Sequence, residues 1–251
     1  MMQLIHSSGT EFFSKIFTVM YNLKNVNKYG YNSYEPCLFY GMYFNEDSIR
    51  LMEHRGQAII LWAGSDIRSK GQPFITKNTP TKVLHLAASP SIEQRLKRVG
   101  FSYRRIPNIA FTNWDYWKPE PLGEKIYFYA PSDFYGLNCL DQIKEFGYPV
   151  IHIDRAQRHD ISKLRNIYKE CFIGLRLTPE DGNSATVLEM GLMGRKTIWN
   201  GDQLSAIPWN DFDKLNELIC VEAKKIGTSQ DAFAKKVYDS VTKTTEGWFD
   251  V

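Results

Sequence analysis

The residues best suited to chemistry lie at 178–198, in the segment TPEDGNSATVLEMGLMGRKTI. Asp181 and the glycine after it are typical of a turn, and Asn183 or Ser184 can cap a helix that begins there. The first amides of such a helix lack partners within it, and the helix dipole favours an anion beside them. Glu189 follows in the same helix, where its carboxylate could accept hydrogen bonds from a ribose. The segment therefore predicts either a nucleotide diphosphate site or a capped structural helix whose glutamate pairs with a surface lysine.

The elements around this segment alternate between apolar strands and amphipathic helices. In the first half, strands are predicted at MQLIH, PCLFYGMY, QAIILWAG, TKVLHLAAS and FSYRRIPNIA, with helices at 11–30, 45–56 and 91–100. In the second half, strands are predicted at KIYFYA, YPVIHID, FIGLRL and KTIWN, with helices at 137–147, 160–171, 184–194, 210–218 and 229–242. This alternation predicts βαβ units with right-handed crossovers and parallel sheets.

A break in the alternation divides the chain. The segment FTNWDYWKPEPLGEK contains Pro119, Pro121 and Gly123, which disfavour regular structure, so it is predicted to be a linker. We therefore expect an α/β protein of two Rossmann-like domains that face each other across a cleft. The N-terminal domain is assigned to residues 1–118 and is compact. The C-terminal domain is assigned to 119–251, and its last helix could pack back on the N-terminal domain.

The bulk composition is that of an ordinary globular protein. The net charge of +3 in 251 residues is too small to indicate nucleic-acid binding by itself. The four cysteines lack metal-site or CxxC spacing, which favours free thiols in a reducing cytosol. No signal-peptide pattern and no run of about 18 apolar residues occurs, so we expect a cytoplasmic protein without a transmembrane segment.

Several common catalytic motifs are missing from the sequence. No Walker A, HExxH or Gly-x-Ser-x-Gly element is present, which argues against P-loop, zincin and hydrolase chemistry. Asp211 and Asp213 spell a DxD motif, but no apolar strand precedes them, so they are interpreted as the start of a capped helix. His85 and His152 lie within predicted strands and are interpreted as interior residues.

The 181–198 segment resembles the acidic-x7-Glu signature in the C-terminal domain of retaining GT-B glycosyltransferases, best known from the GT4 family. Asp181 and Glu189 take the two acidic positions, and Gly194 and the strand at 196–199 follow as in that signature. Three further passages resemble the family in its own order. They are MQLIHSSGT for its first strand and loop, LWAGSDIR for its His-Gly-Ser/Thr-Asp element, and HLAASPSIEQRLKRVG with RRIPNIA for the passage before its linker.

The resemblance implies a retaining, metal-independent transfer of a sugar from a nucleotide diphosphate to an unidentified acceptor. It makes the N-terminal domain the acceptor side and the C-terminal domain the nucleotide-sugar side. Asp181 and Arg176 are the catalytic candidates. The donor-binding candidates are Glu189 for the ribose, Gly182, Asn183, Ser184 and Ala185 near the diphosphate, and Ser8 and Gly9 from the first loop. The acceptor-side candidates are His6, Asp66 and Arg68. No cofactor is expected besides the nucleotide-sugar co-substrate, and the acceptor could be a glycan, a lipid-linked group, a protein or a modified DNA base.

The sequence departs from the family pattern at several positions, and two alternatives stay open. The family's Gly-Arg and Lys after the first C-domain strand are absent, so Arg176 or Arg155 is a candidate replacement, although either could be a surface charge. Ala63 stands where the family has histidine, and the first acid is Asp rather than Glu. These departures favour one alternative, a GT-B-like binding module without transfer activity. The slightly basic charge balance and the compact size permit the other, a glycosyltransferase that acts on a hydroxylated nucleobase in DNA.

Overall fold

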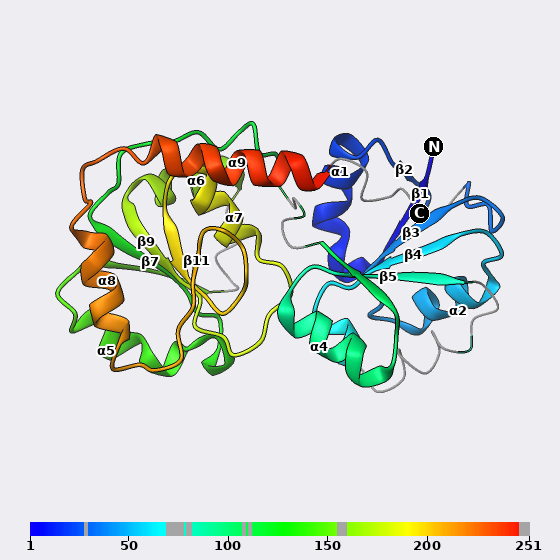
Figure 1. The fold of residues 1–251 in the computed structure, drawn as a ribbon, viewed down its shortest axis with the longest axis horizontal. Coiled ribbons are helices and arrows are strands. Elements are labelled where there is room, and N and C mark those ends of the chain that lie inside the picture. Colours follow the sequence, from blue (N-terminus) through cyan, green and yellow to red (C-terminus); the bar gives the residue numbers. More distant parts are fainter. Residues whose placement is uncertain are drawn as a thin grey trace. The chain divides into compact units, whose positions relative to one another are not determined.

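The computed structural model describes residues 1–27, 30–68, 78, 82–106, 109, 112–154 and 160–245, which form two compact units (Figure 1). Unit 1 consists of Met1–Asn113 and Asp181–Asn183, together with the chain from Thr244. Unit 2 consists of Trp114–Glu180 and Ser184–Lys243. The division after Asn113 falls within the segment that the sequence marks as a linker. Each unit is a parallel sheet with helices on both faces.

Unit 1 contains a six-stranded parallel sheet in the order β2-β1-β3-β4-β5-β6. Its strands are β1 (Gln3–His6), β2 (Lys24–Asn25), β3 (Cys37–Tyr40), β4 (Ala58–Leu61), β5 (Val83–Ala87) and β6 (Tyr103–Arg105). Its helices are α1 (Glu11–Met20), α2 (Asn45–Glu53) and α4 (Pro90–Val99), with short 3-10 turns η1 (Ser8–Thr10) and η2 (Asp66–Arg68). Strands β3 and β4 are buried at every residue because the runs CLFY and AIIL suit a strand covered on both faces.

Unit 2 contains a five-stranded parallel sheet in the order β11-β10-β9-β7-β8. Its strands are β7 (Lys125–Tyr129), β8 (Val150–Ile153), β9 (Cys171–Leu175), β10 (Lys196–Ile198) and β11 (Ala206–Ile207). Its helices are α5 (Leu140–Lys144), α6 (Ile161–Lys169), α7 (Ala185–Leu192), α8 (Leu215–Ala223) and α9 (Asp231–Thr245), with 3-10 turns η3 (Asp133–Tyr135) and η4 (Leu137–Cys139). Helices α5 and α8 lie on one face of the sheet, and α6 and α7 lie on the other (Figure 1).

Both sheets have the same winding. In each unit the second strand lies on one side of the first strand and the third strand lies on the other side. The winding therefore reverses between β1 and β3 in unit 1, and between β7 and β9 in unit 2. Ligands of open α/β sheets bind outside the carboxyl ends of the strands at such a switch point. The topology thus gives each unit one preferred place for a ligand.

The Rossmann-like α/β architecture predicted from the sequence is confirmed, but several boundaries differ. The helix expected over 11–30 ends at Met20, because Asn22 takes a left-handed φ of +50° and the chain then pairs beside β1 as β2. The loop expected to be irregular before the last helices contains β11. Asp211 does not begin a helix: its carboxylate accepts the Asp213 N–H at 3.0 Å in a turn, and α8 starts at Leu215.

Two predictions about the whole chain can be compared with the structure. The four cysteines are all free thiols, as predicted, with Cys37 and Cys171 buried and Cys220 exposed. Within the part of the chain that the structure describes, no helix has the length and apolarity that crossing a bilayer requires.

Candidate functional site

The switch point of unit 2 carries an arginine held against two tyrosines. Arg176 is the first residue after β9, and its guanidinium carbon lies 4.8 Å from the ring centroid of Tyr129 and 5.0 Å from that of Tyr135. Tyr129 ends β7 and Tyr135 ends the following 3-10 turn, so strands β7 and β9 each supply part of the cluster. Contact with two aromatic faces restrains the cation. A guanidinium so placed is the planar donor group that matches a phosphate.

A glycine lets the loop after β7 approach the strand that carries Arg176. Gly136 follows Tyr135 and has a left-handed φ of +86°. A Cβ added there would lie 2.8 Å from the Cβ of Leu177, a distance that side chains do not tolerate. Packing between Gly136 and Leu177 therefore fixes Tyr135 beside Arg176.

Helix α7 begins at the same edge of the sheet, with Ser184 as its N-cap. The Ser184 hydroxyl accepts the Val187 N–H at 3.4 Å, so Ser184 is one of the two capping residues that the sequence suggested. Its carbonyl accepts hydrogen bonds from Leu188 N–H and from the side chain of Gln203, both at 3.3 Å. Ala185 is the first residue of the helix. The donor-binding roles of Ser184 and Ala185 remain predictions.

Glu189 lies within α7 and is only 7% exposed. Its Oε2 accepts a hydrogen bond of 3.0 Å from the hydroxyl of Tyr168, which comes from α6. Tyr168 packs against the rings of Tyr127 and Trp117, with centroids 5.1 Å and 5.6 Å away. Burial raises the pKa of the Tyr168 phenol well above its ordinary value, so the group stays protonated and donates. Glu189 is thus a buried carboxylate that Tyr168 orients.

The residues Asp181–Asn183 belong to unit 1 rather than to the unit that contains α7. The carbonyl oxygen of Asp181 accepts hydrogen bonds from the hydroxyls of Ser89, at 2.8 Å, and Ser91. The Asp181 carboxylate accepts the N–H of Gly182 at 2.9 Å. This Gly182 amide, expected to face a phosphate, therefore already has a partner in the structure.

Close backbone packing explains the glycine at position 182. A Cβ on Gly182 would lie 2.1 Å from the carbonyl oxygen of Ala63, so no other residue fits there without a shift. The Asn183 amide donates to the carbonyl of Ile109 at 2.9 Å. These contacts give Gly182 and Asn183 a structural role in unit 1, and their contact with a donor stays a prediction.

The switch point of unit 1 contains the predicted first-loop residues. His6 ends β1 and is 6% exposed, and Asn27 holds its backbone by accepting its N–H at 2.8 Å and donating to its carbonyl at 3.0 Å. Ser8 and Gly9 lie in the 3-10 turn that follows. The side chain of Thr10 donates to the carbonyl of Tyr40 at the end of β3. His6, Ser8 and Gly9 are thus located where the topology favours a ligand.

The remaining predicted residues are Asp66 and Arg68 on the acceptor side and Arg155 near the diphosphate. Asp66 is 1% exposed, and its carboxylate accepts backbone N–H groups from Met42, Ala63, Gly64 and Ile67 at 2.8–3.1 Å. Burial raises the pKa of this carboxyl although the four donors oppose the shift. Asp66 therefore stabilises the loop after β4, and its contact with an acceptor is a prediction. Arg68 ends η2, and Arg155 lies outside the described residues.

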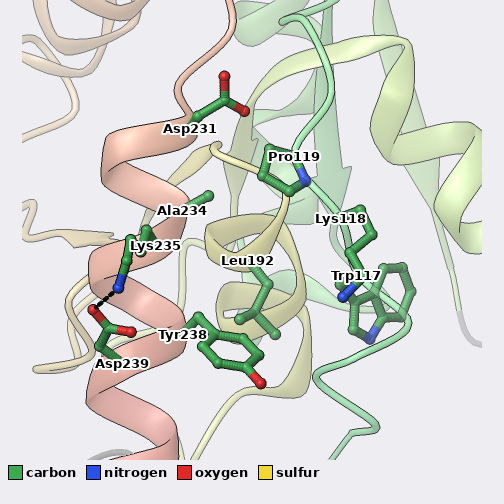
Figure 2. Close-up of a pocket in the computed structure, with 9 residues that line it drawn as sticks. All are labelled: Trp117, Lys118, Pro119, Leu192, Asp231, Ala234, Lys235, Tyr238 and Asp239. Atoms are coloured by element: carbon green, nitrogen blue, oxygen red, sulfur yellow. Dashed lines mark hydrogen bonds and ion pairs between the residues drawn. The ribbon is translucent and has the colours of Figure 1, made fainter.

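A pocket of about 260 Å³ lies elsewhere in unit 2, between residues 117–119 and α9 (Figure 2). Its floor includes Leu192, the last residue of α7, at the opposite end of that helix from Ser184. Its rim carries Lys235 and Asp239, which form an ion pair of 2.6 Å. The pocket is therefore distinct from the edge that carries Arg176. Among the described residues, no group of three or more His, Cys, Asp or Glu side chains is arranged to hold a metal ion.

Comparison with known proteins identifies the fold. No protein-family model and no curated protein sequence matches the chain. Solved structures do match. The DNA modifying enzyme β-glucosyltransferase, solved in the presence and absence of uridine diphosphoglucose, superposes with a TM-score of 0.61 at 11% identity, over 98% of this chain and 98% of that chain. Sucrose-phosphate synthase from Thermosynechococcus elongatus gives a TM-score of 0.59 at 11% identity, over 84% of this chain and 69% of that chain. The chain has the two-unit GT-B fold of these glycosyltransferases.

Sequence reasoning missed the aromatic part of the site. Tyr127 and Tyr129 are two residues apart in the strand KIYFY, so both project from the same face of the sheet. Tyr127 contacts Tyr168 and Tyr129 contacts Arg176. The Tyr-Phe-Tyr alternation at the end of the first strand after the linker was the available signal.

Proposed function

We propose that this protein is a glycosyltransferase that binds a nucleoside diphosphate sugar at the switch point of unit 2. The observation that carries the proposal is Arg176, held against Tyr129 and Tyr135 where the carboxyl ends of β7 and β9 meet. The likeness to two glycosyltransferase structures supports it, and one of those enzymes takes uridine diphosphoglucose as substrate. UDP-glucose is therefore the first donor to test.

Each group at this edge has a role in the proposal. Negative charge develops on the diphosphate as the bond to the sugar breaks, and Arg176 stabilises that charge in place of the basic residues that this chain lacks after β7. No metal ion is needed for that purpose. Glu189 binds the ribose hydroxyls, as the resemblance to the GT4 signature implies. Retention of the anomeric configuration rests on the same resemblance, and analysis of the product anomer tests it.

Ligand-dependent unfolding tests the donor site. A ligand present at about 100 times its dissociation constant adds about 2.7 kcal/mol of stability and raises the unfolding midpoint. We expect UDP and UDP-glucose to raise the midpoint of the wild type, and Arg176→Ala or Glu189→Gln to remove most of that increase. Lys224→Ala, at an exposed position after α8, is the control and should respond as the wild type does. If UDP, GDP, ADP and TDP and their sugar conjugates all leave the wild type unchanged, the proposal is wrong.

A turnover assay separates transfer from binding. Release of free UDP from UDP-glucose in the presence of candidate acceptors indicates transfer. Nucleotide binding without turnover across many donors and acceptors would instead support the GT-B-like binding module.

A hydroxylated base in DNA is the second candidate for the acceptor, because the charge of the chain is unevenly distributed. Residues 1–113 contain 14 Lys and Arg against seven Asp and Glu, whereas residues 114–251 contain 17 against 21. Such asymmetry between halves favours a polyanionic partner for the basic half. The fold match to a DNA modifying enzyme over 98% of both chains points the same way. Transfer of labelled glucose to DNA with hydroxymethylated pyrimidines, and not to unmodified DNA, is the expected result.

A further inference from the structure

The positive charge of unit 1 is concentrated near the last strand of its sheet. Residues 82–113 contain six basic residues and one acidic residue, Glu93. Five of these basic residues lie on α4 and β6, and we call them the basic edge: Arg95, Lys97, Arg98, Arg104 and Arg105. No stretch of similar length outside residues 67–113 has such an imbalance.

The fold exposes this charge along one side of unit 1. β6 is the terminal strand of the sheet, and α4 packs against it and against β5. Lys97 and Arg98 lie in the last turn of α4 and are exposed, the Lys97 side chain by 62%. Arg104 and Arg105 on β6 are half-buried, which restrains their side chains.

The acidic residue of this region is shared among several donors. The carboxylate of Glu93 lies 2.8 Å from the ammonium of Lys97 and 3.4 Å from the guanidinium of Arg105, and it accepts the Tyr103 hydroxyl at 2.7 Å. Arg105 also donates to the carbonyl of Ala87 at 2.7 Å. One negative charge thus orders two cations without neutralising both, and the edge keeps a net positive charge.

Solvated surface helices usually mix the two signs of charge, and α9 of unit 2 does so. It carries Asp231 and Asp239 together with Lys235, Lys236 and Lys243, and Lys235 pairs with Asp239 at 2.6 Å. The basic edge differs from this ordinary pattern. Self-repulsion among its cations is unfavourable unless an anion with several charges lies against them.

We infer that the basic edge binds the sugar-phosphate backbone of duplex DNA. The ten residues of α4 extend over about 15 Å, which matches about four base-pair steps of a DNA strand. Binding of DNA to this edge does not require sugar transfer. Its role in presenting an acceptor base rests on the second candidate of the proposed function.

Salt-dependent binding of a short fluorescent DNA duplex to the full chain tests this inference. The affinity of the wild type should decrease steeply between about 50 and 200 mM salt, because each neutralised phosphate releases counterions. The variant Lys97→Ala/Arg98→Ala should bind about tenfold more weakly at low salt and should reduce the log–log slope by about 1.8, or 0.9 for each lost phosphate contact.

The matched control changes the net charge by the same amount in unit 2. Lys224→Ala/Lys236→Ala removes two exposed lysines at the end of α8 and on α9, and its affinity should remain within about twofold of the wild type. Equal losses in the two double variants would overturn the inference, because net charge alone would then explain the binding. Absence of DNA binding at low salt, or stronger binding to an RNA duplex or to anionic vesicles, would overturn it as well.

The UDP-dependent unfolding shift, measured on the same preparations, separates this inference from the proposed function. DNA binding at the basic edge without any nucleotide shift supports the edge and contradicts the transferase. A nucleotide shift without DNA binding supports the transferase and overturns the edge. Equal unfolding midpoints of the two double variants without ligand confirm that both fold.

Discussion

The hydrogen bond between Tyr168 and Glu189 determines how the glutamate can act. Tyr168 donates to Oε2 and so fixes the carboxylate within a buried aromatic cluster. In the proposed function, this carboxylate also accepts hydrogen bonds from the ribose hydroxyls. In that function, Tyr168 is a positioning residue that acts through Glu189.

Tyr168→Phe should weaken UDP binding about tenfold, because an imperfectly oriented charged acceptor loses about 1.5 kcal/mol of hydrogen bonding. The loss should be much smaller for 2′-deoxy-UDP, which lacks one of the hydroxyls that Glu189 binds. Titration calorimetry with both nucleotides measures the difference. An equal loss for both would mean that Tyr168 supports only the fold.

His85 makes the stability of unit 1 depend on pH. Its side chain is 4% exposed, stacks on Phe101 with centroids 4.2 Å apart, and accepts the Trp62 indole N–H at Nδ1. Burial lowers the pKa of His85 to about 4, whereas an unfolded histidine titrates near about 6.5. Between these values the unfolded chain binds more protons than the native chain, so stability decreases as the pH falls.

We expect His85 to reduce the free energy of unfolding by about 3 kcal/mol as the pH falls from about 6.5 to 4. Urea unfolding at a series of pH values measures this slope. His85→Gln keeps an acceptor for Trp62 but does not titrate, so its slope over the same range should be shallower. An unchanged slope would assign the acid sensitivity to other groups.

At the scale of elements, the position of the loop after β7 depends on a single glycine, Gly136. Gly136→Ala places a Cβ against Leu177 and should displace the loop that carries Tyr135. Gly147→Ala is a matched control, because Gly147 has a similar φ of +84° but no atom within 4 Å of an added Cβ. Both variants should lose about 1 kcal/mol from backbone strain. Gly136→Ala should lose more stability than this shared amount and should also weaken UDP binding, whereas Gly147→Ala should do neither. Unfolding experiments measure the stability, and calorimetry measures the UDP affinity. Equal effects of the two substitutions would contradict the packing role of Gly136.

The sequence was sufficient to predict the elements whose apolar pattern is strong. β3, β4 and β9 are continuous apolar runs, and such runs are typical of strands that are buried on both faces of a parallel sheet. β2 and β11 have two residues each and no pattern of their own, so only pairing with neighbouring strands reveals them.

The local positions of three candidate residues could be predicted for a related reason. Arg176, Ser184 and Glu189 are close in sequence, and they lie just after a strand, at the N-cap of the next helix and within that helix, as the sequence pattern indicated. Their roles in binding stay predictions. Contacts between distant segments were not predictable. Tyr168 is 21 residues from Glu189, and Ser89 is 92 residues from Asp181. Spacing within one motif contains no information about such partners.

At the scale of the molecule, Arg195 joins the linker segment to the core of unit 2. It is fully buried, and its guanidinium donates to backbone carbonyls of Glu120 and Pro121 in the linker and of Tyr168 and Cys171 at the end of α6 and start of β9. Burial lowers the pKa of Arg195 to about 10, so it remains charged at neutral pH. A buried charge is tolerated here because carbonyl oxygens surround it.

Arg195→Met should destabilise unit 2 by more than about 3 kcal/mol, because it removes all of the guanidinium's hydrogen bonds to these backbone carbonyls. Arg165→Met is the control: Arg165 pairs with Glu120 at 3.1 Å but is 26% exposed, so its loss should cost about 1 kcal/mol or less. Hydrogen exchange can locate the effect. Because each unit has its own core, amides of β7 and β9 should lose protection in Arg195→Met while those of β3 and β4 keep it. Equal loss of protection in both sheets would mean that the two cores unfold together. The linker would then contribute to the stability of the whole chain.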